Sequence, residues 1–166
     1  MSLTPNPSSD RKRFRGDLSR PFGDYSKKLL DRSHDEGECR IWDGSKTRIG
    51  YGQMSYMGKT RSVHRVAWMV SHGEIPDGAE VDHTCWNRDC INVDHLRLTT
   101  HRQNGRNLSG AYSRSKTGVR NVSIKRGKYQ VTVGKEHIGT YATLDEAARV
   151  AERERVIRYG EYAGRG

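Results

Sequence analysis

Apolar and polar residues follow two different spacings along the chain. Between residues 39 and 60 they alternate, interrupted by Asp-Gly and Gly-Lys turn signals, which predicts short antiparallel strands. From residue 61 to 71 the valines recur at helical spacing, so we expect a helix that Ser62 caps and Gly73 ends. After a Pro-Asp-Gly turn, residues 79–84 are predicted to form a short strand.

Polar residues dominate the next part of the chain. We expect a loop over residues 86–93 and a helix from about 101 to 108, capped by Thr99 or Thr100. A Ser/Gly/Lys-rich linker follows at residues 109–117. The chain therefore has a natural boundary before its last third.

Alternation returns after the linker and predicts three short strands and one amphipathic helix. Thr143 caps this helix, which runs from about Leu144 to Tyr159 and ends at Gly160. The apolar positions are Val122 and Ile124, then Tyr129, Val131 and Val133, then Ile138 and Tyr141 on the strands, and Leu144, Ala147, Ala148, Ala151, Val156 and Tyr159 on the helix. Three strands and one helix make a small α+β unit.

Composition limits the size of any core. Only 33% of the 166 residues are hydrophobic, the mean hydropathy is −0.93, and the chain has 18 glycines. Small domains of this kind need a further source of stability, such as a bound metal. We predict a basic flexible arm at residues 1–24, a first domain at 25–108, the linker at 109–117 and a second domain at 118–163.

The charge is strongly positive and unevenly distributed. The formal net charge is +10 and the pI is near 9.8. Residues 1–96 hold 15 Lys and Arg against 14 Asp and Glu, whereas residues 97–166 hold 15 against 6. Such a balance favours a polyanionic partner, either nucleic acid or an anionic membrane surface. The sequence has no stretch that predicts a membrane span or a signal peptide, so we expect an intracellular protein.

Residues that move protons or bind hard cations are concentrated between Asp82 and Asn104. A neutral imidazole can accept a proton from water near pH 7, which makes His83 the candidate general base for phosphodiester hydrolysis. Mg²⁺ prefers oxygen donors, and we expect Asp82 and Asn104 to supply them, with Mn²⁺ as a substitute. This segment therefore predicts a nuclease active site.

The same segment also contains thiolate and imidazole donors. Cys85, Cys90 and His95 supply three of the four ligands that a structural zinc site takes, and Cys39, the remaining cysteine, is predicted to be the fourth. Such a site would tie the hairpin region to the active-site loop. A buried cysteine pair without a metal is the alternative.

The segment DHTCWNRDCINVDHLRLTTHRQN resembles the HNH, or ββα-metal, nuclease family, and in particular its zinc-bearing His-Cys-box and phage homing or nicking members. The resemblance implies a ββα-metal module in which His83 activates water and Asn104 binds the catalytic divalent ion. Asp82 matches the Asp-His pair of the phage branch, and His95 stands where the zinc-bearing branch has a zinc ligand. The motif residues are His83, Cys85, Cys90, Asn92, His95, Leu96 and Asn104.

The last 45 residues or so resemble the AP2 DNA-binding domain, through Gly-Val-Arg, Gly-Lys-Tyr, Ile-Gly-Thr-Tyr, Glu-Ala-Ala and Gly-Glu-Tyr-Ala. The resemblance implies a three-stranded sheet that lies in the major groove of double-stranded DNA. The residues then expected to face DNA are Arg120, Lys125, Arg126, Lys128, Gln130 and Thr132. The alternative is a basic sheet that only keeps the protein soluble.

Two functional hypotheses remain after the sequence alone. The chain is either a divalent-metal-dependent DNA endonuclease or a non-catalytic DNA-binding regulator that uses the HNH fold as a zinc-stabilised scaffold. His83, Asp82 and Asn104 together favour the enzyme, because a scaffold would need the zinc ligands without these three residues. Both a monomer and a homodimer are compatible with the sequence.

Overall fold

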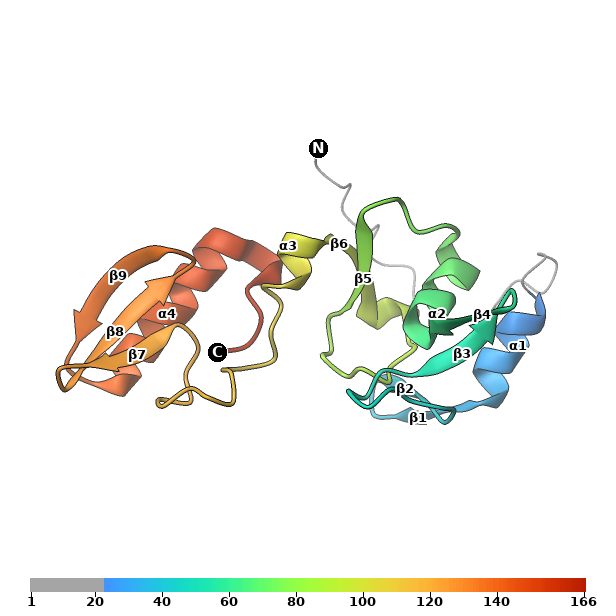
Figure 1. Ribbon diagram of the computed structural model, residues 1–166, viewed down its shortest axis with the longest axis horizontal. Coiled ribbons are helices and arrows are strands. Elements are labelled where there is room, and N and C mark those ends of the chain that lie inside the picture. Colours follow the sequence, from blue (N-terminus) through green and yellow to red (C-terminus); the bar gives the residue numbers. More distant parts are fainter. Residues whose placement is uncertain (1–22) are drawn as a thin grey trace. The chain divides into compact units, whose positions relative to one another are not determined.

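The computed structural model describes residues 23–166, which fall into two compact units divided between His101 and Arg102. The arm predicted for residues 1–24 lies outside the described residues apart from Gly23 and Asp24, which begin the first helix. Small antiparallel sheets and helices make up both units, so the predicted mixed α+β class is confirmed (Figure 1). None of the described helices is long and apolar enough to cross a membrane.

The first unit contains three separate two-stranded antiparallel sheets and two helices that contact each other. Each sheet is a pair of strands that are consecutive along the chain. The elements are α1 (Gly23–Asp31), β1 (Ser33–Glu36), β2 (Cys39–Trp42), β3 (Gln53–Tyr56), β4 (Lys59–Ser62), α2 (Val63–His72), β5 (Ala79–His83), η1 (Val93–His95) and β6 (Leu96–Thr100). The β5–β6 pair is followed directly by α3 (His101–Asn104), which gives the chain order β-β-α.

Trp42 lies at the centre of the first core. It is fully buried and belongs to a cluster of apolar side chains from α1, α2, β2, β3, β5 and β6. Gly52 lies against it so closely that an added Cβ would stand 2.5 Å from a methyl of Val63 and 2.8 Å from the indole. A side chain at this position would therefore push β3 away from α2, and only glycine fits.

Several predicted elements of this unit agree with the structure. Helix α2 follows Ser62 and ends before Gly73, whose φ of 90° is the left-handed conformation that suits glycine at a helix end. The helix begins at Val63 instead of residue 61, because Arg61 and Ser62 are paired in β4. The helix predicted over residues 101–108 covers only His101–Asn104, and Gly105 follows it.

Besides the short polar strand β1 and the single turn η1, two elements of the first unit were not predicted from sequence. Helix α1 is short and polar, and it buries only Ser26 and Leu29 among its described side chains. Strand β6 was not predicted either, because its Arg97 and two threonines break the apolar pattern. Both depend on tertiary contacts that local periodicity does not report.

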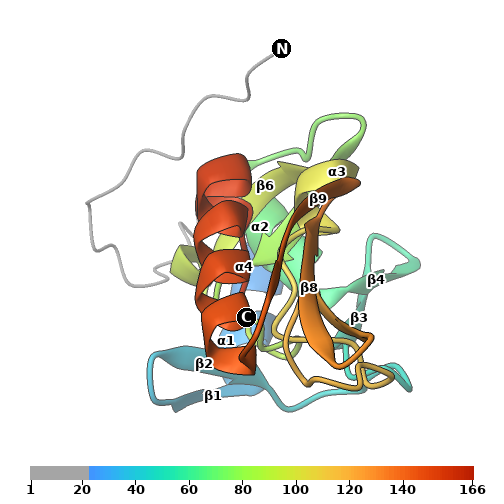
Figure 2. The same ribbon diagram turned by 90° about the vertical axis from the view of Figure 1, so that its left-hand side faces the viewer.

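The second unit is a three-stranded antiparallel sheet with one long helix against it (Figure 2). Its elements are β7 (Val122–Lys125), β8 (Lys128–Val133), β9 (Glu136–Tyr141), α4 (Leu144–Tyr159) and η2 (Gly160–Tyr162), close to the predicted ones. The Thr143 hydroxyl accepts a hydrogen bond from the backbone N–H of Glu146, as the predicted N-cap requires. Val122, Val131 and Val133 pack against Ala147 and Ala151 of α4.

One position of α4 differs from the predicted apolar stripe. Val156 is 55% exposed, whereas Arg155 is 1% exposed and continues the four-residue spacing of Ala147 and Ala151. An Arg155 N–H donates to the backbone carbonyl of Arg120 at 3.3 Å. Polar contacts of this guanidinium therefore complete a helix face that was predicted to be apolar.

Candidate active site and metal centre

Four side chains with zinc-ligand chemistry meet at one point of the first unit. The possible ligand atoms of Cys39, Cys85, Cys90 and His95 all lie within 4.8 Å of one another. The His95 Nδ1 lies 3.5 Å from the sulfur of Cys39 and 3.6 Å from that of Cys90. Zn–S and Zn–N bonds of about 2.3 and 2.0 Å in a tetrahedron place S and N about 3.5 Å apart. The donor set and the spacing therefore fit a zinc ion.

Backbone hydrogen bonds bring the distant Cys39 to the other three side chains. Cys39 begins β2, which runs along the loop that carries Cys90 and makes a bridge between Ile41 and Cys90. The amide of Ile91 donates to the carbonyl of Arg40 at 2.7 Å, and the amide of Trp42 donates to Asp89 at 3.0 Å. The amide of Thr84 donates to the carbonyl of His95 at 2.8 Å and closes the loop at its other end.

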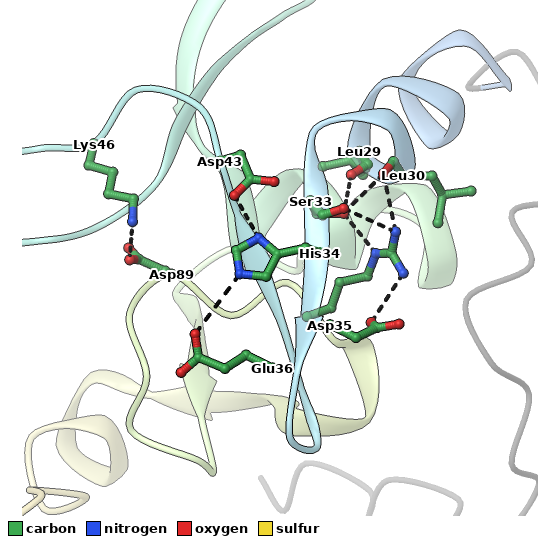
Figure 3. Close-up of polar contacts among 10 residues, drawn as sticks. Leu29, Leu30, Ser33, His34, Asp35, Glu36, Asp43, Lys46 and Asp89 are labelled. Carbon is green, nitrogen blue, oxygen red and sulfur yellow. Dashed lines mark hydrogen bonds and ion pairs between the residues drawn. The ribbon is translucent and has the colours of Figure 1, made fainter.

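Polar side chains hold β1 and β2 in place (Figure 3). The Arg40 guanidinium donates to the Ser33 hydroxyl at 2.7 Å, to the Leu30 carbonyl at 3.1 Å and to Asp35 at 3.2 Å. Lys46 forms an ion pair with Asp89, which lies one residue before Cys90. The strand that presents Cys39 is thus fixed to α1 by polar contacts.

The three thiols share their protons unequally. The hydrogen bond from Cys90 lowers the pKa of Cys85 to about 5, whereas the same contact and burial raise the pKa of Cys90. Burial also raises the pKa of Cys39. One thiolate beside two thiols can bind a cation and release the remaining protons, as zinc sites do.

The two residues at the end of β5 combine a carboxylate with an imidazole. Asp82 is 6% exposed, and its Oδ2 accepts a hydrogen bond from Nε of Arg97, its partner across the strands, at 3.0 Å. The Nε2 of His83 lies 3.0 Å from the carbonyl oxygen of Cys90. Because a carbonyl only accepts, this contact places the His83 proton on Nε2 and leaves the lone pair on Nδ1.

Burial lowers the pKa of His83. The ring is 6% exposed, so its charged form loses hydration that the Cys90 carbonyl only partly replaces. His83 is therefore a neutral imidazole near pH 7, with one nitrogen oriented by the backbone of the metal-cluster loop. A general base needs this combination.

The structure adds two rings to this site that the sequence did not identify. The ring centroid of His64, from the first turn of α2, lies 4.7 Å from that of His83, and Tyr51 lies 5.5 Å from His64 and 6.2 Å from His83. In the sequence, no ligand spacing surrounds His64, a pattern that by itself indicates a packing residue. The contact joins residues that are 19 positions apart, so no local pattern could have revealed it.

Asn104, the other predicted catalytic residue, ends α3 and is half-buried. It lies in the second unit, two residues beyond the unit's first residue, Arg102. The nearby His101 belongs to the first unit and is bound to Glu80 of β5 at 2.8 Å. Asp82 and His83 are thus brought together by the first unit, and Asn104 is placed by the second.

The residues predicted to face DNA have different positions in the second unit. Lys128, Gln130 and Thr132 alternate along β8 with side chains that pack against α4, so they lie on the sheet face opposite this helix. Lys125 and Arg126 are exposed at the turn between β7 and β8. Three cations, an amide and a hydroxyl on and beside one open face can contact nucleic acid.

Arg120 must be removed from this DNA-facing set. It is 7% exposed, and its guanidinium donates to the backbone carbonyls of Ala163, Arg165 and Arg106 at 2.8–3.0 Å. These bonds tie the C-terminal segment to the chain that precedes the sheet. The Arg120 side chain is therefore structural, and a positive charge in the sequence did not by itself indicate a surface position.

Comparisons with known proteins cover part of this chain. Residues 61–106 match the family model described as HNH endonuclease. Protein 7.7 of Escherichia phage T7 is 34% identical over 71 residues, which are 43% of this chain and 55% of that protein. Protein 2.8 of the same phage is 35% identical over 72 residues, which are 42% of this chain and 48% of that protein.

A protein of Enterobacteria phage T3, named uncharacterized gene 5.3 protein, is 56% identical over 34 residues, 20% of this chain and 34% of its own length. The chain spans about half or less of the length of these curated relatives. No solved structure matches it. The family match runs from β4 past α3 and includes Asp82, His83 and Asn104, so residues 61–106 of this chain are similar to HNH endonucleases, and the curated relatives are bacteriophage proteins.

Proposed function

We propose that the protein is a divalent-metal-dependent DNA endonuclease of the phage HNH homing or nicking type, in which His83 is the general base. The observation that carries this proposal is the state of His83. Its ring is neutral, buried and oriented through Nε2 by the Cys90 carbonyl. A residue that only supported a scaffold would not need a neutral, oriented imidazole in this position.

The reaction would use the chain's own groups as follows. His83 Nδ1 takes a proton from a water molecule as the water oxygen bonds to phosphorus. The P–O3′ bond then breaks, and the 3′ oxygen takes a proton from solvent. Asp82 and Asn104 would hold a Mg²⁺ or Mn²⁺ ion, which supplies positive charge to the phosphate oxygens. The sequence pattern supports this ligand pair, and Arg97 fixes the orientation of the Asp82 carboxylate.

A structural zinc ion would be held by Cys39, Cys85, Cys90 and His95. Its position relative to the base supports a structural role, because the Cys90 backbone carbonyl binds His83 while the Cys90 thiol belongs to the cluster. Zinc ligation would thus fix the carbonyl that sets the tautomer of His83.

The second unit would recognise the DNA target as an AP2-like domain. The open face of its sheet carries Lys128, Gln130 and Thr132, with Lys125 and Arg126 at the edge turn. Cations would bind phosphates, and the Gln130 amide could bind an adenine edge. Arg120 has no part in this surface.

The decisive experiment is single-turnover cleavage of bound double-stranded DNA by His83→Ala and by the parent protein, with Mg²⁺ and with Mn²⁺. We expect a rate loss on the order of 10² to 10⁴, the usual contribution of a positioned base, with zinc content and DNA affinity unchanged. His72→Ala on α2 is the matched control, because it removes an exposed histidine of the same unit. The His72 ring stacks on Trp68, with the ring centroids 4.2 Å apart.

The outcome separates the two functional hypotheses. If the parent protein binds DNA but cuts it with neither ion, the non-catalytic regulator replaces the enzyme. If the parent cuts and His83→Ala cuts equally well, the endonuclease stands and the assignment of the base is wrong.

A further inference from the structure

His64 is a buried histidine in contact with the proposed base. It is 6% exposed, and its ring lies 4.7 Å from that of His83 at an interplanar angle of 58°. Both residues belong to the first unit, one on α2 and one on β5. The contact therefore rests on one compact part of the molecule.

Packing does not explain one ring nitrogen of this side chain. Nδ1 of His64 is buried and has no hydrogen-bond partner among residues 23–166. Burying such a nitrogen costs free energy that a phenylalanine of similar shape would avoid. An imidazole at this position is therefore better explained by a polar ligand than by packing against His83 alone.

The surroundings of His64 favour an anionic ligand. His64 is the second residue of the ten-residue helix α2, whose N-terminus carries partial positive charge. The first turn of α2 holds no acidic residue, while Arg61 precedes the helix and Arg65 follows His64. Burial and the positive charge of its neighbours lower the pKa of His64 to about 3, so the imidazole is a neutral N–H donor at working pH.

We propose that His64 is a second catalytic residue, which donates an imidazole N–H to a nonbridging oxygen of the scissile phosphate at the N-terminus of α2. His83 takes the proton from water, and His64 stabilises the charge that grows on the phosphate oxygen. This inference rests on the proposed endonuclease function. It adds a hydrogen bond and no proton-transfer step.

The test compares His64→Phe and His64→Gln in single-turnover cleavage of bound DNA, alongside DNA affinity, Mg²⁺ titration and thermal unfolding. Phenylalanine keeps the ring and removes both nitrogens, whereas glutamine keeps an N–H donor. We expect His64→Phe to lose about 10² in rate, as for other donors to a developing oxyanion, with the Mg²⁺ midpoint unchanged. His64→Gln should cut about tenfold faster than His64→Phe. His72→Phe, the same change further along α2, should cut normally.

Three results would overturn the inference. If His64→Phe cuts at the parent rate, His64 only packs against its neighbours. If the Mg²⁺ midpoint shifts, His64 is a metal ligand. If His64→Gln is as slow as His64→Phe, the proposed hydrogen bond to the phosphate is not made. If His64→Phe does not fold, the rate of His64→Gln against His64→Ala decides the same question. A parent protein that does not cut at all refutes the endonuclease proposal itself, whereas a cutting parent with an inactive His83→Ala leaves only His64 in question.

Discussion

In the first unit, a Cys3His cluster gathers around the loop between β5 and β6, whereas in the second unit the buried guanidiniums of Arg120 and Arg155 donate to backbone carbonyls. Both units thus use a polar cluster where a small apolar core does not reach. The clusters differ in what completes them. Backbone carbonyls of the same unit satisfy Arg120, whereas the three thiols and the imidazole have the chemistry to bind an ion from solution.

The first unit has the larger apolar cluster, which includes Trp42, Leu29 and Val66. Its three sheets are nevertheless separate hairpins, and two-stranded hairpins are marginal by themselves. The second unit has fewer buried apolar residues but one continuous sheet under a 16-residue helix. We therefore expect stability that depends on metal in the first unit and stability that does not in the second.

The largest expected effect is that of zinc removal. Structural zinc sites contribute about 10–16 kcal/mol in small peptides, and a whole domain has only about 5–15 kcal/mol of stability. A strong zinc chelator, or Cys90→Ser, should therefore unfold the first unit and leave β7, β8, β9 and α4 folded. Amide NMR spectra of the full chain, recorded with zinc analysis, would resolve the two sets of signals.

Zinc added back to the chelated parent protein is the control, and it should restore the first set of signals. Cys90→Ser should not recover in the same way, because one thiolate is lost. A first unit that stays folded with no bound metal would support the buried, unmetallated cysteines that the sequence left open.

The second expected effect concerns Arg120. Replacement by methionine keeps most of the side-chain volume but leaves the carbonyls of Ala163, Arg165 and Arg106 without their donor. We expect the second unit to lose about 2–3 kcal/mol of unfolding free energy in chemical denaturation. Lys125→Met, at an exposed position, should change it little. Equal effects of the two variants would mean that these bonds do not stabilise the unit.

Local patterns in the sequence predicted the elements that local residues specify. Thr143 and Gly160 bound α4, and the Arg-Gly and Met-Gly turns set two-residue hairpin loops whose positive φ angles the structure contains. The four predicted zinc ligands span 56 positions and meet in the structure. They could be predicted from sequence because the chain offers few thiol side chains to choose from.

The parts that sequence did not predict depend on contacts between distant residues. Strand β6 exists because it pairs with β5, and α1 because Leu29 reaches the core around Trp42. Arg120 is buried among carbonyls from other segments, and Arg155 donates to the carbonyl of Arg120. The contact of His64 with His83 has the same origin, since α2 and β5 are brought together by packing.

A smaller effect concerns the pH dependence of the first unit. The folded pKa of His64 is about 3, below the ordinary 6.5, so the unfolded chain binds a proton that the folded chain does not. The stability contributed by neutral His64 is complete above pH 6.5 and is lost as the pH falls towards 3. A shift of one pKa unit corresponds to about 1.4 kcal/mol, so about 2 kcal/mol should be lost at pH 5.

Denaturant unfolding of the parent protein and His64→Phe at pH 7 and pH 5 measures this difference. The parent should lose about 2 kcal/mol more than the variant over this range, because phenylalanine cannot be protonated. The second unit serves as the internal reference and should respond alike in both proteins. If the unfolding free energy of the first unit falls by the same amount in both proteins, His64 is accessible to protons in the folded state.

The smallest expected effect tests whether the open sheet face of the second unit contacts DNA. Lys128 lies exposed on that face, whereas Lys135 lies at the opposite hairpin turn between β8 and β9. If Lys128 binds one phosphate, Lys128→Gln should reduce the slope of log K against log salt by about 0.9 and weaken binding a few-fold. Lys135→Gln matches it in charge and should leave the slope nearly unchanged. Binding measured between 50 and 200 mM salt decides this, and equal slopes for the two variants would assign the positive charge of this unit to general attraction instead of a defined DNA-binding face.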